Sequence, residues 1–355
     1  MDETTTLTAS DLKQRWVAYR HENPNVRIRN AAAALGVSEA ELVATSEGEG
    51  VARLDGGWGA LLKEIETLGE VMALTRNDAC VHEKAGHYSD VRLFERHRMG
   101  LVLDEQVDLR LFLNHWHLGF AVETPWEGTK DGLRRSLQFF DADGTAIHKV
   151  FLKRKSDVDA YQRLVAKYRH ADPSSTLEVA PRREAATETP DRAIDRAAFL
   201  QAWAELKDTH DFFPLLKEHG VRRLQALRLA DGTFAERVES TGARQTLQHA
   251  AATETPIMVF VGSPGCIQIH TGPVKKLKEH GPWYNVLDPG FNLHLNETLI
   301  HSAWVVRKPT KDGVVTALEL FDARAGLIAQ FFGKRKPGVP ELEAWREIVK
   351  ALPRL

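Results

Sequence analysis

An internal repeat constrains the fold of this chain more than any other feature of its sequence. Residues 136–144 recur as residues 317–326, and in both copies an apolar segment and then a pair of basic residues follow. A second matching pair, residues 103–111 and 287–295, lies upstream at nearly the same separation. Because similar sequences fold alike, we expect two copies of one structural unit rather than one continuous fold.

The strands of that unit are easiest to recognise in the second copy. Apolar or alternating segments separated by short turns predict strands at residues 257–261, 266–270, 291–295, 303–308, 314–321 and 327–332, and a closing helix at residues 340–352. Strands that are joined by short loops, without helices between them, pair antiparallel. The predicted fold class is therefore α+β, a tandem duplication of a unit with an antiparallel β-sheet and helices packed on one face.

The segment between the two copies has the composition of a linker. Residues 171–195 carry prolines, serines and charged residues with almost no apolar periodicity. We therefore expect an N-terminal α+β repeat over residues 1–170 and a C-terminal α+β repeat over residues 196–355.

Charge balance and apolar content exclude several classes of protein. The chain has 47 Lys and Arg residues against 49 Asp and Glu residues, a formal net charge of −2, so it lacks the basic excess of a nucleic-acid-binding protein. Apolar residues make up 43% of the chain, which is enough for a large core. The first residues carry no basic and apolar leader, and no apolar run approaches the roughly 18 residues of a membrane span. We expect a cytoplasmic protein without membrane insertion.

Several motifs that resemble catalytic or metal sites fail on their spacing. The glycine-rich turn at residues 262–265 connects two strands and lacks the Lys and Ser or Thr of a phosphate-binding loop. His82 and His87 are five residues apart, whereas a zinc-binding helix needs histidines four apart. Cys80 and Cys266 occupy equivalent positions of the repeat, which favours burial as small apolar residues over nucleophilic catalysis.

His210 differs from the other histidines in its setting. Phe199, Trp203, Leu206 and His210 recur at helical spacing, which puts the imidazole on an apolar stripe, and Pro214 should end or kink the helix just after it. A buried structural histidine is the simpler interpretation of this pattern. The alternative is an axial ligand of haem iron, which needs a neutral imidazole beside an apolar slot.

A haem site would also need cations for the two propionates. Lys308 shares a strand face with Trp304, Arg335 follows the last strand, and Arg223 lies on the helical segment after His210. Ammonium and guanidinium groups are natural partners of carboxylates. Taken singly, each of these residues is more often a solvated surface charge.

A set of longer motifs is more specific than these single residues. In the second half the set comprises residues 259–273, 281–289, 291–295 and 304–310, and in the first half it comprises residues 74–77, 81–83, 100–103 and 108–113. Together these motifs resemble the haemin-degrading and haem-trafficking proteins of the HemS/ChuS type. The resemblance covers nearly the whole chain and is weakest before Leu54 and in the linker.

The resemblance implies a fold and a set of site residues. It implies the same tandem duplication, with a haem pocket formed mainly by the second half, and it makes His210 the axial iron ligand, within the motif at residues 208–213. By the same resemblance the pocket is lined by Arg223, Phe260, Lys308, Gln330 and Arg335. Arg110 is the candidate for a distal arginine from the first half. Where relatives commonly carry a tyrosine just before the glutamine, this chain has Ala329.

The resemblance also implies a function in bacterial haem uptake, for which two hypotheses stay open. In the first, the protein degrades haem to release iron, with His210 and Arg110 as catalytic residues and an external electron donor as the source of reductant. In the second, it carries intact haem to a separate haem oxygenase, and its partners belong to the haem-uptake machinery. A duplicated scaffold without any ligand is the third, plainer interpretation.

Overall fold

The computed structural model describes residues 9–172, 177–182, 187–336 and 338–355. The chain divides into two compact units. Within each unit, only the residues in the ranges just given are described. Unit 1 comprises residues 1–75, 85–183 and 263–266, and unit 2 comprises residues 76–84, 184–262 and 267–355. Parts of the predicted linker, and the first residues on which the prediction of a missing leader rests, lie outside the described residues.

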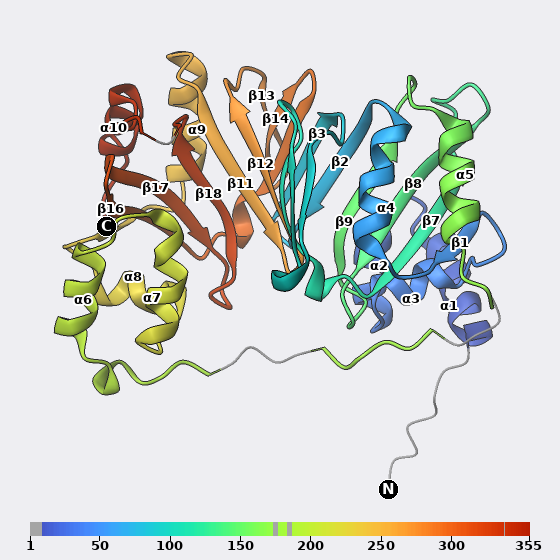
Figure 1. Ribbon diagram of the computed structural model, residues 1–355, viewed down its shortest axis with the longest axis horizontal. Helices are drawn as coiled ribbons and strands as arrows, with labels where there is room; N and C mark the ends of the chain where they lie inside the picture. Colours follow the sequence, from blue (N-terminus) through green and yellow to red (C-terminus); the bar gives the residue numbers. More distant parts are fainter. Residues whose placement is uncertain (1–8, 173–176, 183–186, 337) are drawn as a thin grey trace, which may run out of the picture. The chain divides into compact units, whose positions relative to one another are not determined.

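Unit 1 contains an antiparallel sheet and helices from the first half of the chain (Figure 1). Its strand order is β1-β7-β8-β9-β2, and β4, β5 and β6 form a separate antiparallel group. The strands are β1 (Val51–Leu54), β2 (Val71–Arg76), β4 (Val91–Phe94), β5 (Met99–Leu103), β6 (Asp108–Phe112), β7 (Leu118–Pro125), β8 (Leu133–Phe140) and β9 (Ala146–Leu152). The helices are α1 (Ala9–Glu22), α2 (Ile28–Leu35), α3 (Glu39–Ala44), α4 (Trp58–Glu64) and α5 (Val158–Tyr168).

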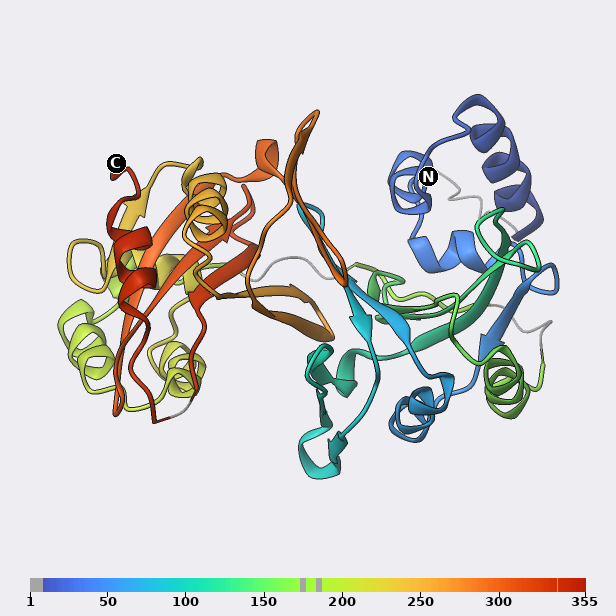
Figure 2. The same cartoon turned by 90° about the horizontal axis from the view of Figure 1, so that it is seen from above.

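Helices cover both faces of the unit 1 sheet, whereas helices on one face were predicted. Ala40 and Val43 of α3 pack with Phe120 and Phe140 of the strands, whereas α4 and α5 pack in a second cluster around Phe139. Figure 2 shows the dark blue helices α1–α3 on one side of these strands and α4 and α5 on the other. Side chains on both sides of the central strands are therefore buried.

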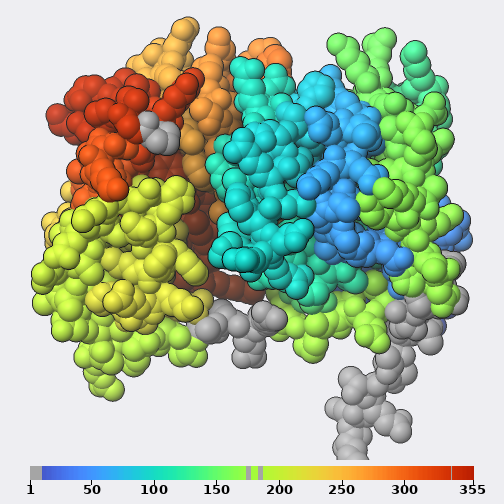
Figure 3. Space-filling model, viewed as in Figure 1, coloured from blue at the N-terminus to red at the C-terminus, as the bar shows by residue number. Residues whose placement is uncertain are grey.

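Unit 2 repeats this architecture with the strand order β10-β16-β17-β18-β11-β12 and a second antiparallel group, β3-β15-β14-β13. The strands are β3 (Cys80–Gly86), β10 (Ala235–Val238), β11 (Ile257–Ser263), β12 (Cys266–Gly272), β13 (Leu277–His280), β14 (Trp283–Asp288), β15 (Phe291–Asn296), β16 (Ser302–Thr310), β17 (Gly313–Phe321) and β18 (Leu327–Gly333). The helices are α6 (Arg196–Ala204), α7 (Phe212–Glu218), α8 (Arg223–Leu229), α9 (Gly242–Ala252) and α10 (Glu343–Lys350). In Figure 3 the yellow-green residues of α6–α8 form one continuous block of packed side chains.

The two copies agree in detail, so the predicted α+β duplication is confirmed. Gln138 of β8 lies opposite Lys149 of β9, and Glu319 of β17 lies opposite Gln330 of β18. Both pairs precede a register shift at the same place, just before the last residue of the middle strand. The strands predicted in the second half are all present, and the closing helix is shorter than predicted, covering only α10.

Each half of the sequence contributes one cysteine to the unit that is formed mainly by the other half. Cys80 packs in the core of unit 2, and Cys266 packs in the core of unit 1. Both thiols are free and fully buried, as the sequence predicted. No helix among the described residues combines the length and the apolar character that a bilayer span requires.

Candidate functional site

His210 lies on a short 3-10 turn, η5 (Thr209–Asp211), and not on the apolar stripe of a helix. The prediction of a continuous helix through this residue was wrong, because α6 ends at Ala204. Pro214 does not end that helix either; it lies in the first turn of α7, where a missing N–H costs nothing. The His210 side chain is 91% exposed, which excludes the interpretation as a buried core histidine.

Asp208 fixes the orientation of the His210 ring. Its Oδ1 accepts hydrogen bonds from the His210 backbone N–H at 2.9 Å and from ring Nδ1 at 2.6 Å. These two bonds, and to a smaller extent the charge of Arg335, lower the pKa of Asp208. With Nδ1 as the donor, Nε2 carries the lone pair, and the described residues give Nε2 no partner. In the tautomer with its proton on Nδ1, the ring therefore presents the Nε2 lone pair as a possible metal-binding nitrogen.

Three of the predicted residues meet at one carboxylate, that of Glu319. Arg223 donates two hydrogen bonds of 2.7 Å, one to each carboxylate oxygen. Lys308 Nζ and Gln330 Nε2 donate to Oε1 at 3.1 and 3.0 Å. We call Arg223, Lys308, Glu319 and Gln330 the Glu319 cluster. Its three donors were predicted to share one site, but their acceptor, Glu319, was not predicted.

The electrostatics of the Glu319 cluster favour three full charges. Burial by itself would raise the pKa of Glu319, but Arg223 and Lys308 outweigh it and lower that pKa to about 2. Burial lowers the pKa of Lys308 to about 8, against the opposing effect of Glu319. One carboxylate between two cations leaves one positive charge in excess. That excess favours binding of an anionic group.

Phe212 connects this cluster to the turn that carries His210. Its ring is buried, and Lys308 Nζ lies 4.3 Å and Arg223 Cζ 5.6 Å from the ring centroid. Phe212 is the first residue of α7, two positions after His210, and η5 contacts β16, the strand of Lys308. The next residue, Phe213, is 73% exposed. The structure thus brings the imidazole, an exposed aromatic ring and two cations into one region of unit 2.

Phe260 and Gln330 share the face of the sheet on which Glu319 lies. Phe260 of β11 is opposite Gln330 in the register, and its ring meets Phe332 edge-on with the centroids 5.0 Å apart. Ala329 points the other way, into the apolar core of unit 2. A tyrosine at that position would not reach the Glu319 cluster, so Ala329 removes no polar group from it.

Arg335 and Arg110 are held by aspartates. Arg335 Nη2 lies 3.7 Å from Asp312 Oδ2, just beyond the end of β18. Arg110 of β6 donates from Nη1 to the Asp108 carboxylate and to the Leu109 carbonyl. Arg110 belongs to unit 1, whereas the other six predicted site residues belong to unit 2.

Glu319 could have been found in the sequence. It is the single charged residue among apolar neighbours in the strand segment 317–321, and it is fully buried. A carboxylate in such a strand needs cationic partners nearby, because burying it alone is costly. The corresponding position of the first copy holds the uncharged Gln138, so a comparison of the copies also singles out Glu319.

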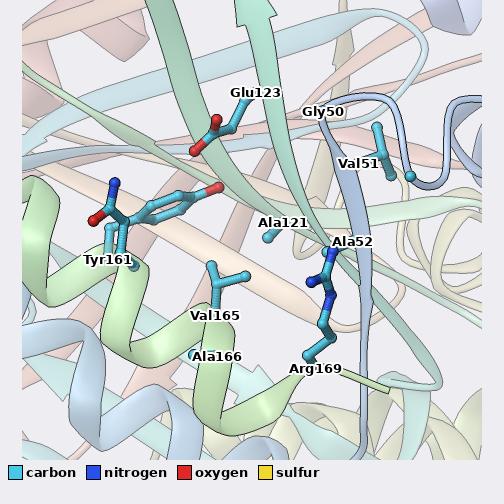
Figure 4. Close-up of a pocket in the computed structure, with 11 residues that line it drawn as sticks. Gly50, Val51, Ala52, Ala121, Glu123, Tyr161, Val165, Ala166 and Arg169 are labelled. Carbon is cyan, nitrogen blue, oxygen red and sulfur yellow. The ribbon is translucent and has the colours of Figure 1, made fainter. Parts of the chain in front are cut away.

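A cavity of about 290 Å³ lies elsewhere, in unit 1 (Figure 4). It opens between α5 and the strands β1 and β7, with Tyr161, Glu123 and Arg169 among its lining residues. None of the predicted site residues lines it.

The family model described as "Haemin-degrading HemS.ChuX domain" matches the chain twice, at residues 36–168 and 220–352. The chain belongs to this family. The two matches correspond to the two copies of the repeat, so the family resemblance and the tandem duplication are both confirmed.

Individual relatives cover nearly the whole chain. The hemin transport protein HmuS of Yersinia pestis is 40% identical over 345 residues, 97% of each chain. Among solved structures, the heme-binding protein PhuS of Pseudomonas aeruginosa in its holo form is 48% identical, with a TM-score of 0.94 over 98% of this chain and 100% of that chain. The heme degrading enzyme ChuS of Escherichia coli O157:H7 is 35% identical, with a TM-score of 0.89 over 98% of this chain and 100% of that chain.

Proposed function

We propose that this protein binds haem in unit 2, with His210 as the axial ligand of the iron, and degrades haem to release iron during haem uptake in the cytoplasm. One observation carries the proposal: the His210 imidazole is exposed, its Nδ1 is held by Asp208, and its Nε2 is free. Iron takes a neutral imidazole as an axial ligand, and a carboxylate on the other ring nitrogen makes that ligand more basic. Relatives that are described as heme-binding and heme degrading support haem as the molecule that the protein binds.

The other predicted site residues of unit 2 suit the propionates and the flat ring of haem. Arg223 and Lys308 offer the positive charge that a propionate needs, and Arg335 offers a second guanidinium for the other propionate. Phe260 and Phe213 offer aromatic surface for the flat porphyrin. The fit therefore includes an iron ligand, carboxylate partners and apolar surface.

In this proposal haem supplies the redox chemistry, and the protein supplies orientation and polarity. His210 would hold the haem iron, and the cations would hold the propionates, so that these residues would orient the porphyrin for its oxidation. Arg110 of unit 1, the predicted distal arginine, would supply hydrogen-bond donors for the reaction. Electrons come from an external reductant.

A haemin titration of the wild type and His210→Ala tests the proposal. We expect one haem per chain with a Soret band in the wild type and loss of that spectrum in the variant. Ascorbate, or NADPH with a reductase, is then added in the presence of catalase. Bleaching to a bilin-like product with iron release supports degradation. Absence of a His210-dependent spectrum would reject haem binding at this residue.

A carrier function is the second candidate. The relatives HmuS of Yersinia pestis and HemS of Yersinia enterocolitica are hemin transport proteins, and an iron ligand on an exposed turn is accessible to an acceptor protein. The carrier hypothesis predicts stable haem under the same reducing conditions and transfer of intact haem to an added haem oxygenase. Transfer without bleaching would favour the carrier over the enzyme.

A further inference from the structure

Glu319 is the most heavily bonded acidic side chain in the region of the proposed haem site. It is fully buried in the middle of β17. Oε1 accepts from Arg223, Lys308 and Gln330, and Oε2 accepts a second bond from Arg223. No single one of its donors is bonded so extensively within the cluster, so Glu319 determines where the two cations lie.

The duplicated unit shows that the fold does not need a carboxylate at this position. In unit 1 the equivalent strand position holds Gln138, opposite Lys149. Lys149 is paired there with Glu39, the first residue of α3. In unit 2 the first residue of α8 is Arg223, so the helix start carries the cation and the strand carries the carboxylate. Both units bury an ion pair in this location, but only unit 2 places its carboxylate within the sheet.

We propose that Glu319 is a positioning residue of the haem site, which holds the Lys308 ammonium and the Arg223 guanidinium side by side for a propionate of haem. This inference rests on the proposed function. Two cations that are taken out of water repel each other and lose hydration, and a carboxylate between them offsets both costs. Glu319 therefore prepares the site before a ligand carboxylate arrives, and Gln330 completes the set of donors around it.

The groups that face Lys308 set its charge. They are Glu319 from β17 and Arg223 from α8, together with the uncharged Gln330 from β18 and Phe212 from α7. Burial lowers the pKa of Lys308 to about 8, Glu319 raises it and Arg223 lowers it further. Replacing Glu319 with glutamine removes the one group that raises this pKa. The ammonium should then lose its proton at a lower pH, and with it part of its attraction for a propionate.

The experiment measures haemin affinity from pH 6 to pH 9 in the wild type and Glu319→Gln. The haemin affinity of the wild type should begin to fall near pH 8, and that of the variant should begin to fall at a lower pH. In both proteins the affinity should fall by at most about tenfold per pH unit, because one proton is lost. Haemin dimethyl ester is the second probe, because it keeps the iron and lacks both carboxylates. With the ester, the wild type and the variant should show the same pH dependence.

Matched variants separate charge from packing. Glu341→Gln changes another buried glutamate of unit 2, which accepts from Thr316 and Arg346, and should leave the pH profile unchanged. Glu319→Asp keeps the charge and should restore the wild-type profile. Lys308→Gln should abolish the fall in haemin affinity near pH 8. This variant tests the role of the Lys308 charge even if Glu319→Gln does not fold.

Two results would overturn the inference while leaving haem binding intact. One is a Glu319→Gln profile that matches the wild type in a variant with wild-type thermal stability. The other is a fall in haemin affinity near pH 8 that persists in Lys308→Gln. If the wild type itself shows no His210-dependent Soret band, the proposed function fails first and the inference fails with it.

Discussion

A buried polar chain in unit 1 leads to a quantitative prediction about stability. Tyr88, His148, Thr75 and Cys266 are all fully or almost fully buried. Thr75 Oγ1 donates to Cys266 Sγ at 3.4 Å, so it accepts from His148 Nδ1 at 2.8 Å. His148 Nε2 then accepts from the Tyr88 hydroxyl. The hydrogen bonds therefore run in one direction, from Tyr88 through His148 and Thr75 to Cys266, and His148 takes part in two of them.

The perturbation is His148→Leu, which keeps a side chain of similar size and removes both ring nitrogens. The Tyr88 hydroxyl would lose its bond inside the core, at a cost of about 1–3 kcal/mol, and the lost bond to Thr75 adds about 0.5–1.5 kcal/mol. We expect the free energy of unfolding to fall by roughly 2–4 kcal/mol. Urea unfolding of the full chain, with far-UV circular dichroism as the signal, measures it.

Tyr88→Phe in the His148→Leu background isolates the hydrogen bond from packing. Removing the orphaned hydroxyl should recover at least about 1 kcal/mol, so the double-mutant cycle should show coupling of that size. Strictly additive effects, or a His148→Leu cost below about 1 kcal/mol, would refute the hydrogen-bond chain. The second copy supports the expected recovery, because Ala329 stands at the equivalent position in an apolar core.

Three further predictions concern acid stability, the iron ligand and close packing. Burial lowers the pKa values of His82, His148 and His270 below the ordinary 6.5, so these histidines stay neutral in the folded protein. The unfolded state therefore takes up protons first as the pH falls. From pH 6 to pH 5 the free energy of unfolding of the ligand-free protein, measured by urea titration, should drop by up to about 1.4 kcal/mol for each histidine. Asp208→Asn should weaken haemin binding by about 10–100-fold without loss of folding, because His210 loses its charged partner, and a titration in which affinity is unchanged contradicts this role. Gly119→Ala should cost about 1–3 kcal/mol, because its Cβ would lie 2.6 Å from the Trp58 ring, whereas Gly56→Ala meets nothing within 4 Å and serves as the thermal-unfolding control.

The sequence was informative where a local pattern decides the structure. Strand β15 alternates apolar and polar residues, and β11 and β12 are separated by a glycine-proline turn, so all three strands were predicted correctly. The turn at His210 was missed because aromatic spacing alone was extended through residues 205–209. Asp208 caps that turn with its side chain, and an aspartate before Thr209 could have signalled the break. The Glu319 cluster joins residues 96 positions apart, and no local pattern contains that contact.

The two copies of the repeat show how one fold supports different polar sites. Adjacent residues of the last strand point to opposite faces, so His148 and Lys149 in unit 1 correspond to Ala329 and Gln330 in unit 2. Unit 1 places its polar chain on the core face, and unit 2 keeps that face apolar and places the Glu319 cluster on the other. Because the core face holds polar residues in one copy and apolar residues in the other on the same backbone, the apolar positions that the copies share maintain the fold. The positions at which they differ, such as Glu319 and Gln138, give the two copies different polar chemistry.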